Sequence, residues 1–449
     1  MTDNKKDVPG GATRSHSHSL IESSISSGAL ILITLLTGVL LSRLLGPEGR
    51  GQYGSAIFWS NFAGTFLTFS LYEAALLKIR ARRENGAGFL PSLLTLSGML
   101  SLLAIALGPI LVLTGVVKVE GIDSWVLLVF LVTNFILVVG QNAFGTVELS
   151  NLRFIMVNIE RAVTPFLMML CIVVLFLLDV ADLPLLLLLF VACRLPNFVP
   201  RIYRYRHHLI GKVDTGFLKE TGRLGWRMNL SHAAMGLAGE ADRLVIVPLW
   251  SAQMLGYYFA AMSTCGASLA IVGQAIEVTL LPTLTGLGLD EKRRKIEQMF
   301  RFAVIMGLGM GVALSLAAPF LVPLVFGEAF TPAVYYVQGL IFASMIKPII
   351  SILSISHFSE QKMMPGIYTA GAFVTVFLTG FLITGFDHLP EFFVVLGLAN
   401  LASLLTSLTL LVRAGLIRIG QEIVPGPADV VLLTTSLWHY GMQIVRRKR

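Results

Sequence analysis

The sequence predicts an all-α, polytopic membrane protein in which about 12 transmembrane helices form two similar bundles around a central cleft. Three observations lead to this prediction. The 449 residues are 55% hydrophobic and only 13% charged, whereas a soluble domain carries about 25% charged residues. Apolar stretches of about 20 residues, long enough to cross a bilayer as helices, recur along the whole chain. A short polar turn near the start returns in a related form about half-way along.

This turn has the sequence SRLLGPEGRGQYG in its first copy and LWSAQMLGYYFAA in its second. We expect Gly46 and Pro47 to end the first helix, because proline removes a backbone donor and glycine relaxes the turn. Gly51 then opens the next helix, and an offset of 205 residues places it on Gly256. One pattern at the first hairpin of each half is typical of transporters built from two repeats.

Glycine, proline and charged residues separate the apolar stretches and mark the turns between them. The expected spans are residues 20–45, 51–77, 88–115, 122–149, 153–178, 183–206, 224–249, 255–283, 297–326, 331–356, 363–386 and 390–415. The first six make an N-terminal bundle, residues 20–206, and the last six make a C-terminal bundle, residues 224–415. Because six is an even number, both halves enter the membrane from the same side, and the repeats are parallel.

The basic residues predict the orientation of these spans, because cytoplasmic loops are enriched in Lys and Arg. With a cytoplasmic N-terminus, the inner segments hold most of the 34 Lys and Arg residues. The outer loops then hold only Arg43, Arg50 and Lys118. We therefore expect both termini in the cytoplasm, where residues 1–19 form a polar N-terminal segment.

Two further basic segments are expected on the cytoplasmic face. Residues 207–223 form the longest inner loop and divide the halves, and their charge fits both the topology and contact with anionic lipid. The tail, residues 416–449, holds an apolar stretch that is too short to span and ends in RRKR, which predicts an amphipathic helix on the inner surface. The net charge of +8 is thus assigned to membrane topology, and nucleic acid is not expected as a partner.

The sequence gives little sign of catalytic or metal chemistry. Its three cysteines are scattered in apolar segments without ligand spacing, so we expect neither a metal site nor a disulfide framework. A membrane enzyme such as a glycan polymerase would be expected to carry a large outer loop, but every predicted outer loop is only a few residues long. We therefore expect no enzymatic activity and no cofactor, other than Na⁺ or H⁺ as a coupling ion.

Ionisable and polar groups inside spans are costly unless they face a cavity, so they are the candidate substrate-binding residues. In the cleft these candidates are Arg227, Asn229, His232, Arg243 and Lys347. Local alternatives exist for three of them: Arg227 reaching the inner surface, His232 hydrogen-bonded in the core, and Arg243 in a local ion pair. Lys347 has no acid within one helical turn, so it should face the cleft, where it suits a pyrophosphate as a point charge.

Three acidic residues are candidates for binding a coupling ion, and they are Glu73, Asp242 and Glu277. Glu73 and Glu277 lie at nearly the same place in the two halves, and the alternative for Glu73 is an ion pair with Lys78. The bases within the spans outnumber the well-buried acids, which favours an anionic cargo over a cationic one. These bases are Arg161, Arg194, Arg227, Arg243 and Lys347.

Three stretches, SRLLGPEGRGQYG, ADRLVIVPLWSAQMLGYYFAA and PLVFGEAFTPAVYYVQGLIFA, resemble the polysaccharide repeat-unit flippases of the multidrug/oligosaccharidyl-lipid/polysaccharide exporter superfamily. The resemblance covers residues 20–415 and implies twelve helices around a central cavity. It implies alternating access that passes an undecaprenyl-diphosphate-linked oligosaccharide across the bacterial inner (plasma) membrane, for export of exopolysaccharide, O antigen or capsule. The motif match carries over Asp242 and Arg243, together with the hairpin residues Gly46, Gly51 and Gly256.

The resemblance also implies partners and leaves alternatives. The expected partners are the lipid-linked oligosaccharide, membrane lipids and other polysaccharide-assembly proteins. One alternative on the same fold is a cation-coupled, multidrug-type exporter of small molecules, although cationic drugs would favour a cleft with net acidic charge. The other is a lipid II flippase, but the lipid II flippases that resemble this fold carry two further helices, for which the tail is too short.

Overall fold

The computed structural model describes residues 16–266, 284, 288–359, 364–386, 388–418 and 426. Within these residues every regular element is a helix, as predicted. The N-terminal half contains α1 (His16–Phe66), α2 (Leu71–Arg82), η1 (Gly86–Phe89), α3 (Leu90–Leu113), α4 (Ser124–Ser150), α5 (Phe154–Leu177), α6 (Leu183–Ala192), η2 (Leu195–Asn197), α7 (Phe198–Tyr205) and η3 (Arg206–His208). The C-terminal half contains α8 (Thr215–Leu249), a helix at residues 252–266, α10 (Leu289–Phe326), η4 (Glu328–Phe330), α11 (Ala333–Ser344), α12 (Lys347–Ser359), α13 (Met364–Thr384) and α14 (Leu389–Arg413).

Nine helices within the described residues are long and apolar enough to cross a membrane. One of them runs from Leu32 to Arg82 and contains two of the predicted spans. Two more predicted spans fall outside this group: α8 is charged along much of its length, and only residues 252–266 of the eighth predicted span are described as helix. Counting the two predicted spans within Leu32–Arg82 separately, and adding α8 and the helix at residues 252–266, gives twelve spans in the part of the chain that the structure describes.

The first predicted turn is tighter than expected. Gly46 alone leaves helical geometry, with φ 67° and ψ −177°, and the helix resumes at Pro47 within α1. A positive φ suits glycine, because a side chain would be strained there. Proline suits the start of the new helical segment, where its missing N–H costs no hydrogen bond. Arg50 therefore lies on a helix and is only 9% exposed, so its predicted place in an outer loop is wrong.

Several predicted spans contain breaks that the sequence did not indicate. The second predicted span is divided between α1 and α2, where Phe69 and Ser70 have positive φ angles of 51° and 52°. The sixth is divided at η2, and the tenth between α11 and α12. Such breaks leave backbone groups and side chains at mid-membrane depth, where they line cavities in transporters.

The predicted inner loop at residues 207–223 is shorter in the structure, because α8 begins at Thr215. The Asp214 carboxylate starts this helix by accepting a hydrogen bond from the backbone N–H of Phe217 (2.8 Å). The predicted tail helix lies outside the described residues, except for residues 416–418 and 426, and so does Glu277.

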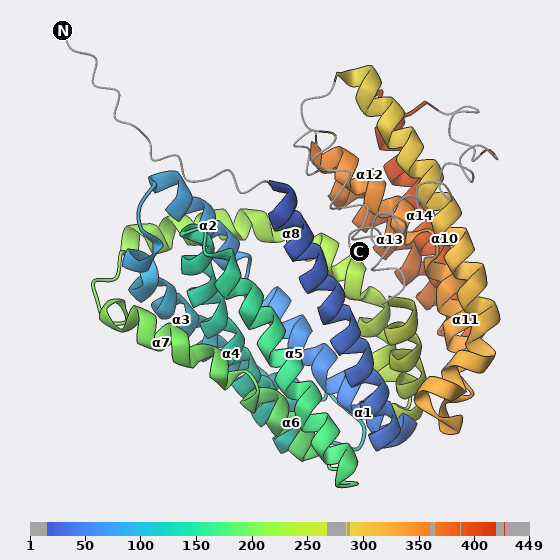
Figure 1. The fold of residues 1–449 in the computed structure, drawn as a ribbon, viewed down its shortest axis with the longest axis horizontal. Coiled ribbons are helices and arrows are strands. Elements are labelled where there is room, and N and C mark those ends of the chain that lie inside the picture. The colour runs from blue at the N-terminus through green and yellow to red at the C-terminus, as the bar shows by residue number, and fades with distance from the viewer. Residues whose placement is uncertain are drawn as a thin grey trace, which may run out of the picture.

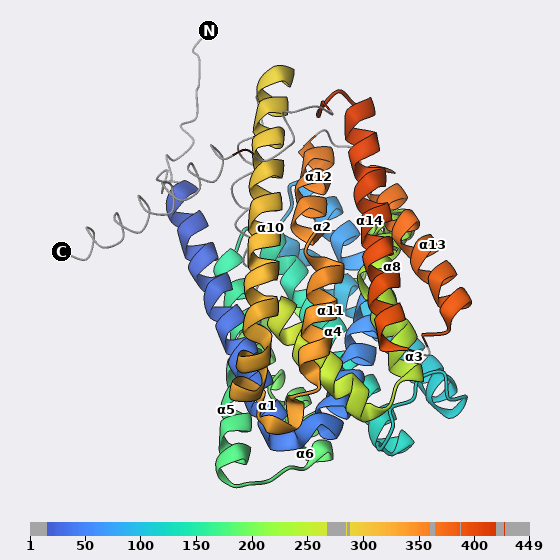
Figure 2. The ribbon, with the colours of Figure 1, turned by 90° about the vertical axis from the view of Figure 1, so that its right-hand side faces the viewer.

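The two halves form blocks of helices that lie side by side (Figure 1). One block is α1–α7, and the other is α10–α14. Figure 2 shows the helices of this second block running next to one another. Helix α8 packs against both α2 and α13 and so joins the blocks. The largest cluster of buried apolar residues draws on both halves, from Tyr53 and Phe58 to Tyr258. Large apolar side chains elsewhere are exposed, such as Phe320 (80%) and Leu382 (82%), as suits helices that face lipid.

Candidate functional site

The two copies of the repeated turn pack against each other where the halves meet. A Cβ atom added to Gly51 would lie 1.7 Å from the carbonyl oxygen of Ala252, and one added to Gly256 would lie 1.7 Å from that of Pro47. The offset of 205 residues maps each of these contacts onto the other. Two similar units related by a two-fold axis make such reciprocal contacts. We call this contact the hairpin seam (Pro47, Gly51, Ala252 and Gly256).

Polar contacts between the halves lie beside the hairpin seam. Arg43 of α1 donates to the carbonyl oxygens of Val325 (2.8 Å) and Leu324 (2.5 Å), at the C-terminal end of α10. The Glu120 carboxylate accepts a hydrogen bond from the backbone N–H of Ala252 (2.8 Å), at the N-terminal end of the following helix. A cation at a helix C-terminus and an anion at a helix N-terminus are both favourable. The N-terminal half thus binds two helix ends of the C-terminal half.

Away from the hairpin seam, α2 and α8 join the halves. Within the described residues Lys78 forms an ion pair with Glu220 (3.2 Å). The alternative considered for Glu73, an ion pair with Lys78, is therefore not formed in the part of the chain that the structure describes. Arg82 forms an ion pair with Asp214 (3.1 Å). These contacts form a second, more polar junction, which links the last turns of α2 to the first turns of α8.

This junction lowers the pKa of both carboxyl groups. The hydrogen bond from the backbone N–H of Phe217 is the main cause of the lowered pKa of Asp214, and Arg82 adds to it. The hydrogen bond from Lys78 is the main cause of the lowered pKa of Glu220. Both carboxyl groups therefore favour the charged form that their basic partners need.

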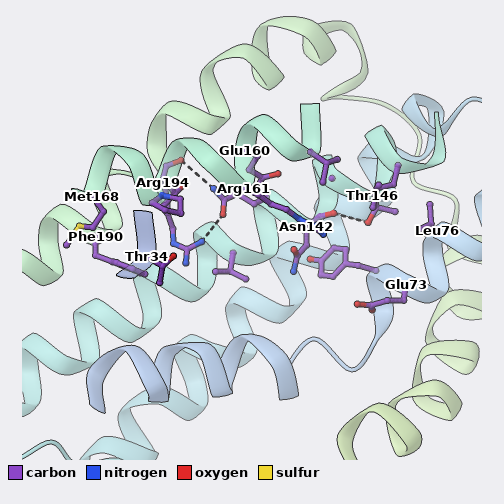
Figure 3. Close-up of a pocket in the computed structure, with 18 of the residues that line it drawn as sticks. Thr34, Glu73, Leu76, Asn142, Thr146, Glu160, Arg161, Met168, Phe190 and Arg194 are labelled. Carbon is purple, nitrogen blue, oxygen red and sulfur yellow. Dashed lines mark hydrogen bonds between the residues drawn. The ribbon is translucent and has the colours of Figure 1, made fainter. Parts of the chain in front are cut away.

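A large cavity lies inside the N-terminal half and has a volume of about 620 Å³. Helices α1, α2, α4, α5 and α6 contribute to its wall (Figure 3). We call it the N-cavity, and its polar lining includes Thr34, Thr37, Tyr53, Glu73, Gln141, Asn142, Glu160, Arg161 and Arg194. Bound small molecules typically occupy pockets of about 300–1,000 Å³, so the N-cavity is large enough for a polar headgroup.

Two guanidinium groups of the N-cavity differ in how they are held. Arg194 donates from its Nη1 to the Gln141 side-chain oxygen (3.0 Å), and its guanidinium lies 5.1 Å from the centre of the Phe190 ring. Arg161 is exposed, and within the described residues it has no ion pair. Neither arginine is paired directly with a carboxylate in the part of the chain that the structure describes.

The acid closest in sequence to these arginines is engaged elsewhere. Glu160 forms an ion pair with Arg201, which also binds Glu148 through two hydrogen bonds of 2.6 and 3.2 Å. Arg201 is 4% exposed and Glu148 is 1% exposed, so this ion network is buried. One guanidinium group thus serves two carboxylates, so Glu160 keeps part of its negative charge on the wall of the N-cavity.

A smaller cavity lies inside the C-terminal half and has a volume of about 300 Å³. We call it the C-cavity, and its polar lining includes Asp242, Lys347, Ser351, Thr369, Asn400 and Ser403. Asp242 accepts a hydrogen bond from the Tyr258 hydroxyl (2.5 Å). Lys347 is exposed and lacks an ion pair within the described residues, and it lines this cavity inside the C-terminal half, whereas the prediction placed it in the cleft between the halves.

The remaining predicted binding residues lie elsewhere. Arg243 forms an ion pair with Glu240 (2.7 Å), which is the local alternative that the sequence left open. His232 Nδ1 lies 3.0 Å from the hydroxyl of Ser70, so the histidine is hydrogen-bonded as its alternative described, but it is exposed and does not lie in the core. Arg227 is exposed and Asn229 is partly buried, and neither lines the N-cavity or the C-cavity.

The structure adds site residues that sequence reasoning did not single out. Gln141 and Asn142 both line the N-cavity. Their signal was available, since two adjacent amides interrupt the apolar run LVVGQNAFG. Of the predicted coupling-ion residues, Glu73 lines the N-cavity and Asp242 lines the C-cavity beside Lys347.

Comparisons with known proteins now bear on this arrangement. A family model described as "Polysaccharide biosynthesis protein" matches residues 40–335. Among curated proteins, none matches the chain.

Solved structures share the fold at low sequence identity. The lipid II flippase MurJ in an inward closed conformation has a TM-score of 0.72 and 12% identity, with 90% of this chain and 89% of that chain covered. An inward-facing multidrug resistance MATE transporter of the MOP superfamily has a TM-score of 0.59 and 15% identity, with 86% and 94% covered. The MATE multidrug transporter DinF-BH has a TM-score of 0.59 and 16% identity, with 92% and 98% covered.

At these identities the structures establish the fold, and the family model covers more than half of the chain. The predicted all-α architecture of two helical bundles is confirmed. The chain belongs to the polysaccharide biosynthesis protein family and has the fold of the flippases and transporters of the MOP superfamily.

Proposed function

We propose that the protein is a flippase that moves an undecaprenyl-diphosphate-linked oligosaccharide across the bacterial inner membrane, for export of a polysaccharide. Membership of the polysaccharide biosynthesis family and the transporter fold support this function. The observation that carries the substrate is the lining of the N-cavity, which combines guanidinium groups, neutral amides and hydroxyl groups. A diphosphate requires positive charge, and a glycan requires many hydrogen-bond donors and acceptors.

The mechanism that we propose is alternating access, in which the two halves rock against each other. Transporters built from two repeats move in this way around a binding site where the repeats meet. The hairpin seam supports the proposal, because its reciprocal glycine contacts join the two repeats through the same backbone atoms on each side. The contacts of Arg43 and Glu120 lie beside it and would break when this end opens.

We also propose that both termini are cytoplasmic, because most basic residues then lie on the inner side. Reporter fusions after Arg83 and after Arg449 should then read cytoplasmic, and a fusion after Lys118 should read periplasmic. A periplasmic C-terminus would contradict the twelve-span topology.

A cation-coupled exporter of small molecules has weaker support. In the part of the chain that the structure describes, Arg161, Arg194 and Lys347 line the two cavities without a paired carboxylate, which disfavours a cationic cargo. Glu73 and Asp242 each line one cavity, so either remains a proposed site for a coupling Na⁺ or H⁺.

The experiment that tests the function uses purified protein in proteoliposomes that contain an undecaprenyl-diphosphate-linked oligosaccharide. Movement of the glycan to the outer leaflet is measured by its accessibility to an added glycosidase. We expect protein-dependent movement of this lipid and no uptake of the cationic dye ethidium. Dye uptake without glycan movement would favour the multidrug-type alternative, and movement of lipid II alone would favour the lipid II alternative.

A further inference from the structure

A small pocket in the N-terminal half lies between the ends of three helices and carries charges of both signs. Its volume is about 80 Å³. The last turn of α4, the first two turns of α5, η2 and α7 contribute to its wall. Figure 1 shows α7 at the outer edge of the N-terminal block. We call it the α5–α7 pocket, and its lining includes Glu148, Ile159, Glu160, Asn197, Arg201 and Arg204.

The inner wall of this pocket carries an excess of negative charge. Arg201 binds both carboxylates there, Glu148 through two hydrogen bonds and Glu160 through its Oε2. Two carboxylates that share one guanidinium group leave one negative charge without a partner. Glu160 is the more accessible acid, since its side chain is 19% exposed and that of Glu148 is 1% exposed. Within the described residues the Oε1 of Glu160 accepts no hydrogen bond, so it is free for a cationic ligand.

A neutral acceptor lines the same pocket. Asn197 is 6% exposed, and its Nδ2 donates to the Thr164 hydroxyl (2.8 Å), which leaves its Oδ1 to accept. A carboxylate oxygen and an amide oxygen suit a primary ammonium group, which has one positive charge and three N–H donors. The pocket has several times the volume that one water molecule needs. A metal ion is disfavoured, because no group of three or more His, Cys, Asp or Glu among the described residues could hold one.

The mouth of the pocket is basic. Arg204 is exposed and has no ion pair in the part of the chain that the structure describes, whereas Glu148 lies deep in the wall. Arg153, which is also exposed, directly precedes α5, and the Tyr205 hydroxyl lies within electrostatic reach of both arginines. Arg201 adds a buried Nη1 without a hydrogen-bond partner within the described residues, and such a donor is costly. Several guanidinium donors near one point suit a phosphate group.

The surface around the mouth is apolar and lies at a membrane boundary. Val199 and Ile202 of α7 are 69% and 46% exposed, and Ile159 of α5 is 50% exposed. The pocket lies near the last turns of the candidate span Leu183–His208 and the first turns of the candidate span Met156–Leu177. Lipid headgroups lie at this depth, where basic side chains meet phosphates and aliphatic side chains meet acyl chains.

We propose that the α5–α7 pocket binds a lipid whose headgroup carries a primary ammonium group and a phosphate, namely phosphatidylethanolamine. The ammonium group enters first and binds Glu160 and Asn197, while the phosphate stays at the mouth on Arg204 and Arg153. This order fits the lipid, because its phosphate lies between the ammonium group and the acyl chains. The proposal goes beyond the proposed function and does not depend on which cargo the protein moves.

Other phospholipids match the pocket less well. A phosphatidylglycerol headgroup brings no positive charge to Glu160. A phosphatidylcholine headgroup brings a bulkier cation that has no N–H donor. Glu160 also lines the N-cavity (Figure 3), so the bound ammonium group would supply the positive charge that this carboxylate otherwise shares with Glu148.

The first test measures lipid binding to the full-length wild-type protein by native mass spectrometry in detergent. The probes are phosphatidylethanolamine, its N-methyl and N,N-dimethyl derivatives, phosphatidylcholine and phosphatidylglycerol, all with the same acyl chains. We expect the affinity to fall with each added methyl group, by about 10-fold to 100-fold in total, because charged hydrogen bonds are lost. Phosphatidylglycerol should also bind at least about 10-fold more weakly than phosphatidylethanolamine.

Two substitutions separate the ammonium contact from the phosphate contact. Glu160→Gln should abolish the preference for phosphatidylethanolamine over phosphatidylcholine, because Glu148 and Arg201 then balance each other. Arg204→Gln should weaken both lipids by a similar factor, since both carry the phosphate. The matched controls, Glu84→Gln and Lys219→Gln, each remove an exposed charge outside the pocket and should leave every affinity unchanged.

Three outcomes would overturn the proposal. They are equal binding of phosphatidylethanolamine and phosphatidylcholine by the wild-type protein, a preference that persists in Glu160→Gln, and binding of phosphatidylglycerol as tight as that of phosphatidylethanolamine. The last outcome would assign the pocket to phosphate alone. Thermal unfolding identifies a variant that fails to fold, and the methylation series then decides, because it needs only the wild-type protein.

Discussion

The N-cavity and the C-cavity occupy two halves of similar architecture but offer a ligand different chemistry. The N-cavity holds two guanidinium groups, two carboxylates and a pair of adjacent amides in about 620 Å³, whereas the C-cavity holds one ammonium group, one carboxylate and one amide in about 300 Å³. At the hairpin seam, in contrast, the halves make the same contact twice. The repeat has thus kept the surface by which the halves meet, while the interiors have diverged.

The largest predicted effect concerns the ion networks behind the two cavities. Arg201→Gln should destabilise the protein by about 3–5 kcal/mol, because it leaves the buried carboxylates of Glu148 and Glu160 without their partner. The matched change in the C-terminal half, Arg243→Gln, breaks a partly exposed pair with Glu240 and should cost about 1 kcal/mol or less. Thermal unfolding in detergent compares the two. Equal losses of stability in the two variants would contradict the expected difference between the buried ion network of Arg201 and the partly exposed pair of Arg243.

The next effect separates the cavities by transport. The double variant Arg161→Gln/Arg194→Gln should lower glycan movement by about 100-fold, since two charged contacts are lost. Lys347→Ala should lower it by about 10-fold, as the loss of one point charge, and Lys347→Arg should keep part of the activity. Proteoliposome assays at matched protein levels measure both. A larger loss from Lys347→Ala would assign the cargo to the C-cavity instead.

A smaller and symmetric effect is expected at the hairpin seam. Gly51→Ala and Gly256→Ala each place a Cβ atom 1.7 Å from a backbone oxygen of the other half, so each should destabilise by about 1–3 kcal/mol. Gly98→Ala is the control, because its Cβ atom meets nothing within 4 Å and alanine favours a helix. Unfolding temperatures should fall equally for the first two variants. A clear inequality between them would contradict the reciprocal contact.

The smallest effect lies at the α2–α8 junction. Because the pKa values of Asp214 and Glu220 are lowered in the folded protein, their contribution is present above the unfolded pKa values and is lost as the pH falls through the folded ones. Stability should therefore decline below about pH 4. The double variant Asp214→Asn/Glu220→Gln should show a weaker decline in thermal unfolding. An unchanged pH profile would mean that the junction contributes nothing.

Local patterns predicted much of the fold. Apolar length predicted the spans, and the glycine pattern predicted the turns that meet at the hairpin seam. The break at Phe69 and Ser70 was not predictable, because positive φ angles at these residues have no sequence signature and depend on the packing around them.

The candidate site was harder to predict than the fold. Charges are densest along α8, which directed attention to Arg227, His232 and Arg243, although neither cavity takes its wall from these side chains. The N-cavity instead brings Arg161 and Arg194 together with Gln141 from three separate segments. No spacing along the chain indicates that these three meet, because their proximity follows from how the helices pack.

One contact beside the hairpin seam bears on how such a chain arises. Gly54 and Phe259 are equivalent under the offset of 205 residues, and a Cβ atom on Gly54 would lie 2.3 Å from the Phe259 ring, so the two residues face each other across the two-fold axis. In a homodimer of identical six-helix units this position would meet its own copy, as two glycines with a void or two rings in collision. Duplication and fusion of the unit into one polypeptide remove that restriction. A ring on one half then fills the space that a glycine leaves on the other, and the two copies are no longer interchangeable.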